Sequence, residues 1–302
     1  MSIDLTGRVA IVTGAGGGLG REHALALAAR GAKVVVNDLG GARDGSGGSS
    51  AAALAVVEEI LAAGGEAIAN GASVTDYAAV QAMVSETIAK WGRVDILVNN
   101  AGILRDKSFA KMELDEFKLV MDVHLMGAVH CCKAVWPIMT EQKYGRIVMT
   151  TSSSGLYGNF GQSNYGAAKM ALVGLMQTLS LEGAKYDIRV NSLAPTAATR
   201  MTESLFPPEF LQALQPADVV PAMLVLASEQ APNRTILCAG AGSFEAAHIT
   251  LTQGVHIGHA SDAPEQLAAR LAEVRQREHE TVPESGMAQG HLELTKAMAN
   301  KK

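Results

Sequence analysis

Tyr165 and Lys169 are the two residues whose types and spacing most directly suggest chemistry. On a helix, residues four apart lie on the same face, one turn from each other. A phenol has a pKa of about 10, which makes it a weak base at neutral pH. An ammonium about 4 Å away would lower that pKa by roughly 3 units at an effective dielectric of about 20. The pair therefore predicts proton exchange with a hydroxyl, although an isolated Tyr-x-x-x-Lys is by default a surface pair.

Ser152 lies thirteen residues before Tyr165, at the end of a predicted strand over 145–151. Its hydroxyl could hold and polarise the same substrate oxygen that exchanges a proton with Tyr165. The next two residues, Ser153 and Ser154, are expected to serve the turn. Together, Ser152, Tyr165 and Lys169 form the predicted catalytic group.

A glycine-rich turn over 13–20 follows the first predicted strand and reads T-G-x-x-x-G-x-G. Gly14, Gly18 and Gly20 allow a tight turn, and they let a pyrophosphate approach the N–H groups of the helix that starts near Leu19. Such a turn can also be no more than a tight connection. Its place between a strand and a helix favours dinucleotide binding.

Asp38 ends the second predicted strand, over 33–37. A carboxylate here can accept hydrogen bonds from the adenosine ribose and would repel a 2′-phosphate, which predicts NAD as the cofactor. The alternative interpretation of Asp38 is a loop acid that starts a turn. Arg43 could approach a 2′-phosphate, so NADP is disfavoured but stays open.

Asn100, Ala101 and Gly102 follow another strand, over 94–99. In sheets of parallel strands, ligands bind in the crevice beyond the carboxyl ends of the strands. These three residues are therefore candidates for the cofactor site, although the string by itself could be only a turn.

The elements that must position these residues alternate between strands and helices. The segments between the short apolar runs have apolar residues at helical, 3.6-residue spacing. Near-continuously apolar strands that alternate with helices predict a doubly wound, Rossmann-type parallel sheet of about seven strands. The predicted strands cover 8–13, 33–37, 67–70, 94–99, 145–151, 188–193 and 235–238.

The pattern changes near residue 254, which predicts a single domain over 1–254 and a helical extension over 255–302. Asp262 and Glu265 have the spacing of a helix start in this extension. We expect the extension to pack on the domain or on a partner subunit. Long apolar helices over 114–139 and 164–186 also predict a homodimer or homotetramer.

Composition excludes several classes of function. The chain has 302 residues, 48% of them hydrophobic and 18% charged, with a net charge of −5. This is typical of a soluble α/β protein, and it argues against nucleic acid as a partner. Apolar runs are broken well short of about 20 residues, so no membrane partner is expected. The three cysteines and eight histidines show no disulfide framework and no metal-ligand spacing. The N-terminus does not read as a signal peptide, and cytoplasmic localisation is expected.

The turn over 13–20, the strand-end Asp, Asn-Asn-Ala-Gly, Ser and Tyr-x-x-x-Lys stand in the order and spacing of one family. In these motifs the chain resembles the short-chain dehydrogenase/reductases over residues 8 to about 200. The resemblance implies their fold, a nicotinamide cofactor and a Ser–Tyr–Lys mechanism. It also implies that Lys169 holds the nicotinamide ribose and that Thr199 lies near the carboxamide. Ser73, which stands where family members often have an Asp, and Val74 are expected near the adenine.

His124 departs from the family pattern. Most members have Asn in the segment V-N-x-x-G, where it anchors a water that relays protons behind the Lys, whereas this chain has V-H-L-M-G over 123–127. Imidazole can both donate and accept hydrogen bonds in such a relay. The alternative is a packed helix histidine that is bonded to the backbone.

A closer resemblance within the family is carried by four segments, 37–41, 123–127, 143–147 and 157–162. In these segments the chain resembles the (3R)-hydroxyacyl-CoA dehydrogenase units of type 2 peroxisomal multifunctional enzymes, which are also called 17β-hydroxysteroid dehydrogenases type 4. This implies oxidation of a (3R)-3-hydroxyacyl-CoA to the 3-ketoacyl-CoA. A hydroxysteroid substrate is the alternative, and a catalytically silent NAD-binding sensor is a weaker one.

An apolar segment over 201–214 follows the last active-site strand, and prolines interrupt it. It predicts a lid, with Leu205 and Phe206 over the substrate. The lid suits either an acyl chain or a steroid. No cluster of basic residues marks a CoA phosphate site, although Arg105, Lys107 and Arg200 are candidates near the mouth of the crevice.

Overall fold

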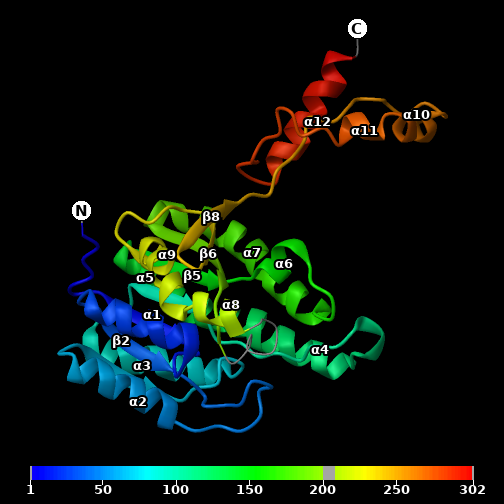
Figure 1. The fold of residues 1–302 in the computed structure, drawn as a ribbon. Coiled ribbons are helices and arrows are strands. Elements are labelled where there is room, and N and C mark those ends of the chain that lie inside the picture. The colour runs from blue at the N-terminus through cyan, green and yellow to red at the C-terminus, as the bar shows by residue number, and fades with distance from the viewer. Residues whose placement is uncertain (1, 200–207, 301–302) are drawn as a thin grey trace. The chain divides into compact units, whose positions relative to one another are not determined.

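One eight-stranded sheet forms the centre of the fold (Figure 1). A computed structural model describes residues 2–199 and 208–300. The strand order is β3-β2-β1-β4-β5-β6-β7-β8, and β1 to β7 pair in parallel. The strands are Val9–Thr13 (β1), Lys33–Asn37 (β2), Glu66–Asn70 (β3), Ile96–Asn99 (β4), Gly145–Thr150 (β5), Ile188–Thr196 (β6), Ile236–Gly240 (β7) and Ser243–Ala247 (β8).

The sequence predicts about seven strands, and the structure adds an eighth, β8. Its residues are largely exposed and carry no apolar run, so it lacks the pattern that marks the other strands. Ala241 and Gly242 connect β7 to β8, and both have positive φ angles. Two such residues are typical of the tight turn between neighbouring antiparallel strands.

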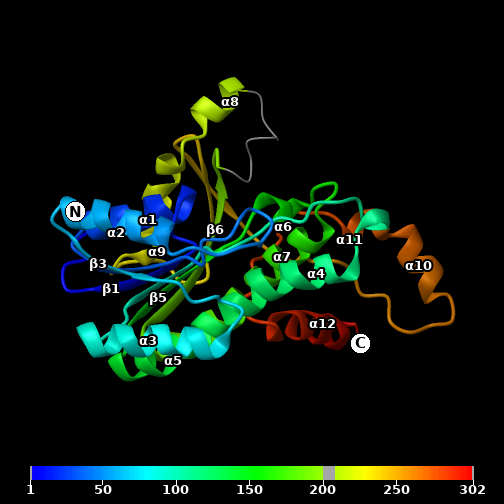
Figure 2. The same cartoon turned by 90° about the horizontal axis from the view of Figure 1, so that it is seen from below.

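Helices cover both faces of the sheet and thereby bury its central strands on both sides (Figure 2). Helix α1 contacts α2 and α9 in one layer, and α3, α4, α5 and α7 form the other. The predicted doubly wound parallel arrangement is confirmed. The helices of this unit are Gly18–Ala29 (α1), Ala51–Ala62 (α2), Tyr77–Trp91 (α3), Leu114–Met121 (α4), Gly127–Gln142 (α5), Ser153–Tyr157 (α6), Ser163–Gly183 (α7), Pro208–Ala213 (α8) and Val220–Ala227 (α9).

Helices α4 and α5 run on through a π-helical turn, Asp122–Met126, as one continuous helix, Leu114–Gln142. By length and composition this helix could cross a membrane, although the sequence predicts no membrane-spanning segment. Core helices pass the same test, and α5 packs against β4 and β5. We therefore interpret it as a core helix. π-helical turns occur often at functional sites, and this one contains His124.

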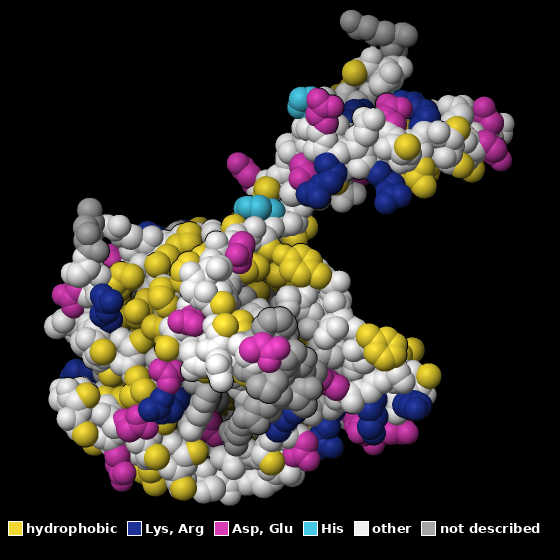
Figure 3. Space-filling model, viewed as in Figure 1, with side chains coloured by type: hydrophobic (Ala, Val, Ile, Leu, Met, Phe, Trp, Pro, Cys, Tyr) yellow, Lys and Arg dark blue, Asp and Glu magenta, His cyan; other side chains and the backbone are white. Residues whose placement is uncertain are grey.

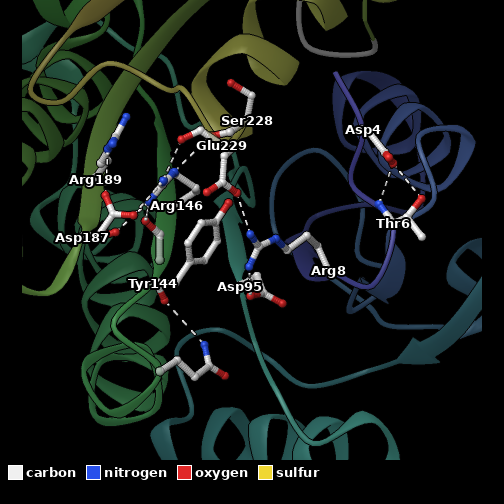
Figure 4. Close-up of polar contacts among 12 residues, drawn as sticks. Asp4, Thr6, Arg8, Asp95, Tyr144, Arg146, Asp187, Arg189, Ser228 and Glu229 are labelled. Carbon is white, nitrogen blue, oxygen red and sulfur yellow. Dashed lines mark hydrogen bonds and ion pairs between the residues drawn. The ribbon is translucent and has the colours of Figure 1, made fainter. Parts of the chain in front are cut away.

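Arg146 anchors the amino ends of the strands (Figure 4). Its guanidinium is fully buried and donates to the backbone oxygens of Asp187 at 2.7 Å and Ser228 at 2.9 Å. The Tyr144 ring lies near two guanidiniums, that of Arg8 at 3.7 Å and that of Arg146 at 4.2 Å. These contacts tie β5, the start of β6 and the segment after α9 together. They lie at the strand ends opposite to the predicted site.

The chain divides into two compact units, Met1–Ala246 and Ala247–Lys302. The predicted division, after residue 254, lies a few residues further on. Among the described residues from 247 to 300, none is buried. A bridge between Leu251 and Thr281 joins two parts of the second unit. Its helices are Ala263–Ala269 (α10), Leu271–Val274 (α11) and Met287–Ala299 (α12).

Candidate active site

The glycine-rich turn between β1 and α1 needs glycine for steric reasons. A β-carbon on Gly14, whose φ is +63°, would lie 2.8 Å from the Ala101 Cα. A β-carbon on Gly20 would lie 2.2 Å from the Gly14 oxygen. Helix α1 has no side-chain cap and no acid in its first turn, so its N–H groups suit an anion. Beside the turn lies Thr199, 3.5 Å from the position of a β-carbon on Gly18.

Thr13 and Asn100 join the end of β1 to the segment after β4. The Asn100 Nδ2 donates to the backbone oxygens of Thr13 and Gly14, both at 3.0 Å. In return, the Thr13 Oγ1 accepts from the backbone N–H of Asn100 at 3.0 Å and of Ala101 at 3.1 Å. The structure therefore brings the predicted Gly14, Asn100 and Ala101 together. Thr13 was not predicted, although it is the first residue of the T-G motif.

Asp38 uses both carboxylate oxygens on nearby backbone. Its Oδ2 accepts from the Gly16 N–H at 2.7 Å and its Oδ1 from the Gly40 N–H at 2.6 Å. The second bond, two residues on, is the turn that the alternative interpretation describes. The first holds the carboxylate against the glycine-rich turn. Asp38 is therefore both a turn residue and a neighbour of the predicted cofactor site.

Ser73 and Val74 follow β3. The Ser73 hydroxyl lies 2.8 Å from the Thr75 hydroxyl, in a local turn. Val74 is buried, and a β-carbon on Gly127 would lie 2.6 Å from its side chain. Val74 also lines a small cavity that His124 shares.

Ser152, Tyr165 and Lys169 come together from two elements. Ser152 caps α6, and its side chain accepts from the Ser154 N–H at 3.2 Å and is hydrogen-bonded to the Tyr165 phenol. Tyr165 and Lys169 lie one turn apart on α7, with the Lys169 Nζ 5.4 Å from the centre of the Tyr165 ring. That Nζ donates to the backbone oxygen of Thr150 at 2.6 Å. The predicted catalytic group is thus assembled at the carboxyl end of β5.

Burial shifts the pKa values of this pair in opposite directions. It raises the pKa of Tyr165 to about 12, against the lowering effect of the hydrogen bond to Ser152. It lowers the pKa of Lys169 to about 7. The structure contradicts the predicted fall in the Tyr165 pKa. The reason is that burial disfavours the charged form of both side chains, so the ammonium that should lower the phenol pKa is itself destabilised.

His124 lies in the π-helical turn, edge-on to the Tyr165 ring with 5.2 Å between ring centres. Its Nε2 is 2.8 Å from the Ile103 oxygen and 3.1 Å from the Ile103 nitrogen. The Nδ1 is buried and has no partner among the described residues. Burial lowers the pKa of His124 to about 3, so the ring is neutral at physiological pH.

A cavity of about 10 Å³ connects these groups, and His124, Lys169 and Asn99 line it. This is about the size that one water molecule needs. The Asn99 Oδ1 and the His124 Nδ1 are both buried without a partner among the described residues. Asn99 was not predicted as a site residue, although it precedes Asn100 in the same motif.

Two parts of the prediction lie outside the described residues. Leu205 and Phe206, the expected substrate contacts, fall in the segment 200–207. So does Arg200. Within the described residues, no group of three or more His, Cys, Asp or Glu side chains could hold a metal ion.

Comparison with known proteins decides the family. The model of the short chain dehydrogenase family matches residues 8–209, which is more than half of the chain. This protein belongs to the short-chain dehydrogenase family. The family predicted from the motifs is therefore confirmed, and so is the prediction of an enzyme of this class.

Several relatives are similar along most of this short-chain dehydrogenase. A short-chain type dehydrogenase/reductase of Mycobacterium tuberculosis is 50% identical over 268 residues, 88% of this chain and 93% of that protein. The peroxisomal multifunctional enzyme type 2 of Drosophila melanogaster is 50% identical over 259 residues, 85% of this chain and 43% of that enzyme. The chain thus spans less than half of that relative.

Solved structures support the same assignment. The full-length Drosophila enzyme superposes with a TM-score of 0.81 at 36% identity, over 99% of this chain and 51% of that one. A 7α-hydroxysteroid dehydrogenase, in complex with NADH and 7-oxo glycochenodeoxycholic acid, has a TM-score of 0.71 at 32% identity, over 80% of this chain and 95% of that one.

Proposed function

We propose that this enzyme oxidises (3R)-3-hydroxyacyl-CoA to 3-ketoacyl-CoA with NAD. The observation that carries the proposal is the convergence of Ser152, Tyr165 and Lys169 beside the glycine-rich turn. Asp38 is hydrogen-bonded to the backbone of that turn. The similarity to the peroxisomal multifunctional enzymes favours the acyl-CoA substrate. A silent NAD-binding sensor is disfavoured, because a sensor needs no assembled proton-exchange group.

The residues around the glycine-rich turn fit a dinucleotide. Gly14 and Gly20 leave no room for a β-carbon, and the uncapped start of α1 offers N–H groups to a pyrophosphate. Asp38 favours NAD, because its carboxylate would repel a 2′-phosphate. When bound, NAD supplies the hydride acceptor for the alcohol carbon.

The side chains of the site handle the proton of the substrate hydroxyl. Ser152 holds the substrate oxygen, and the Tyr165 phenol exchanges a proton with it. A phenol with a pKa of about 12 is protonated at neutral pH, which suits proton donation to a ketone. Oxidation needs the phenolate, so the phenol proton must first be released to solvent. The charged form of Lys169, one helix turn away, would stabilise that phenolate.

His124 would act in this exchange as a neutral hydrogen-bond partner. Its low pKa disfavours an imidazolium, so the ring does not carry the proton as a charge. Its Nδ1 and the Asn99 Oδ1 border the cavity that also reaches Lys169. A water held there would extend the hydrogen-bonded path from Lys169. The bonds from Nε2 to Ile103 also match the packed, backbone-bonded alternative, and substitution of His124 distinguishes the two.

The substrate is tested by comparing kcat/KM for NAD-linked oxidation of the two 3-hydroxyacyl-CoA enantiomers and of estradiol. We expect the (3R)-acyl-CoA to be preferred. A hydroxysteroid is the second candidate, since the hydroxysteroid dehydrogenase structure is similar over most of its length. If estradiol is preferred by more than about tenfold, which corresponds to about 1.4 kcal/mol of transition-state free energy, the steroid function replaces the acyl-CoA function.

We also propose that the protein is a homodimer or homotetramer in the cytoplasm. A partner subunit would cover the described part of the second unit. Residues 247–300 of that unit, the part that the structure describes, include no buried residue, although Leu271, Val282, Leu294 and Met298 are large and exposed. Figure 3 shows hydrophobic side chains on the surface of these C-terminal helices. Exposed apolar side chains on helices without a core favour a covering partner.

A further inference from the structure

The loop between Asp38 and α2 is a closed, ordered structure. The Ser49 N–H donates to the Leu39 oxygen at 2.9 Å, so the two ends of the loop meet. The Ala42 N–H donates to the Ser46 oxygen at 2.7 Å within it. A β-carbon on Gly40 would lie 1.7 Å from the Ser49 oxygen, so this closure requires glycine. Compact loops whose ends meet are frequently functional.

This loop is joined to the segment 104–106, which contacts the catalytic helix α7. The Leu104 N–H donates to the Arg43 oxygen at 3.1 Å, and the Arg105 Nε donates to the Asp44 oxygen at 2.8 Å. The Arg105 oxygen in turn accepts from the Asn164 side chain at 3.0 Å, directly before Tyr165. The loop and the catalytic helix α7 therefore hold the segment 104–106 between them.

A surface pocket of about 420 Å³ lies where the loop meets this segment. Its volume is within the range of small-molecule sites. The loop contributes one wall and the segment 104–106 the other. The pocket is lined by Ala42, Arg43, Asp44, Ser46, Leu104 and Asp106.

The charged side chains of the pocket differ in whether they have partners. The Asp44 carboxylate accepts from the Ser46 N–H at 3.0 Å and from its hydroxyl at 2.7 Å. The Asp106 carboxylate accepts from the Gln162 amide at 2.7 Å. The half-buried Arg43 guanidinium makes no hydrogen bond or ion pair with any described residue. Both carboxylates have neutral hydrogen-bond donors as partners, so Arg43 is the charged side chain of the lining that has no hydrogen-bond or ion-pair partner among the described residues.

We propose that this pocket is a phosphate-binding subsite, with Arg43 as its cation, for the nucleotide end of a CoA thioester. The proposal rests on the proposed acyl-CoA function. A guanidinium binds phosphate through paired, charge-assisted hydrogen bonds. One wall of the pocket continues into the segment that contacts the catalytic helix, as a substrate that reaches from Tyr165 to the surface requires.

The other basic candidates at this edge have partners or lie outside the described residues. The Lys107 ammonium is paired with Glu116 at 2.7 Å. The Arg105 Nε is used on the Asp44 oxygen, and Arg200 falls in the segment 200–207. Arg43 is thus the best-placed cation for a phosphate.

The test compares a full CoA ester with a shortened one. The wild type, Arg43→Ala, Arg43→Lys and the exposed control Arg30→Ala would be assayed with acetoacetyl-CoA and with acetoacetyl-pantetheine, which lacks the nucleotide. We expect Arg43→Ala to raise the KM for the CoA ester about tenfold, as loss of a charge-assisted bond predicts. The kcat, the KM for the pantetheine ester and the Kd for NADH should stay within twofold. Arg43→Lys should restore part of the affinity, and Arg30→Ala should resemble wild type.

A second measurement, the binding of 3′,5′-ADP to the NADH-loaded enzyme by calorimetry, does not depend on turnover. Binding by wild type and its loss in Arg43→Ala would support the subsite. Equal KM changes for both esters, an unchanged KM for the CoA ester, or an effect confined to NADH or NADPH affinity would overturn it. If wild type oxidises or reduces no acyl-CoA ester, the proposed function fails, and the ADP measurement still decides the subsite.

Discussion

Gly102 and His124 are packed so closely that a β-carbon on Gly102 would lie 2.3 Å from the Cε1 of the His124 ring. The ring cannot move aside easily, because its Nε2 is held at Ile103. We therefore predict that Gly102→Ala destabilises the protein by about 1–3 kcal/mol, as overpacked substitutions do. Urea unfolding of Gly102→Ala, His124→Ala and the double variant would measure this.

The double variant is the control for that packing. Removing the imidazole should make room for the new methyl group, so its loss of stability should be smaller than the sum of the two single losses. Additivity within about 0.5 kcal/mol would contradict the proposed steric conflict. The activity of His124→Ala across pH 6 to 9 is a separate readout. Unchanged activity there would support a packing role for His124 instead of a hydrogen-bonding role in proton exchange.

Tyr165→Phe should abolish turnover and leave NADH binding nearly intact. The phenol hydroxyl is the group that exchanges the substrate proton, and the ring itself remains in place. Steady-state rates and NADH fluorescence titration would separate these effects. In wild type, kcat/KM for oxidation should rise with pH, because more of the Tyr165 phenol is deprotonated. Normal turnover by the Phe variant would show the mechanism to be wrong.

Asp38→Ala should weaken NAD binding and relax discrimination against NADP. The carboxylate would repel a 2′-phosphate, and its Oδ2 also accepts a hydrogen bond from the Gly16 N–H at 2.7 Å. Asp38→Asn separates the two effects, since it removes the charge and can keep one acceptor for the backbone. Side-by-side kcat/KM values for NADH and NADPH are the measurement. A wild type that prefers NADPH would refute the assigned role of Asp38.

His23 predicts a loss of stability in acid. It is fully buried on α1, neither ring nitrogen has a partner among the described residues, and burial lowers its pKa to about 4. The unfolded state, with a pKa of about 6.5, binds more protons between these values, so stability falls as the pH drops from 6.5 through 4. At pH 5 the loss from this residue is about 2 kcal/mol.

His23→Leu should therefore unfold at a higher urea concentration than wild type, and the difference should be larger at pH 5 than at pH 7. His259→Gln, at an exposed position, is the control and should not change the pH dependence. An equal gain at both pH values would mean that removal of an unpaired polar group, and not its titration, accounts for the effect.

Light scattering at micromolar concentration tests the predicted homodimer or homotetramer. A monomeric mass would contradict it. Because the described second-unit residues have no core of their own, a chain ending at Ala246 is also informative. If a partner subunit covers the helices of that unit, the shortened chain should form an oligomer of fewer subunits, or associate more weakly, than the full chain.

Features that depend on short stretches of sequence could be predicted. The spacing of Tyr165 and Lys169, the turn with Gly14 and Gly20, and the alternation of apolar strands with helices each follow from local periodicity and steric rules. They were enough to predict the family and the doubly wound sheet. The strand β8 was missed, because a short, exposed strand has no apolar pattern.

Only the tertiary structure decided how the predicted residues act on one another. The direction of the pKa shifts at Tyr165 and Lys169 depends on how deeply α7 buries them, and spacing along a helix carries no information about desolvation. The contact of Gly102 with His124, and the pocket at Arg43, join segments that are distant in the chain. Such contacts arise from the packing of elements, so the sequence by itself determined which groups are present, and the fold decided their distances, partners and charges.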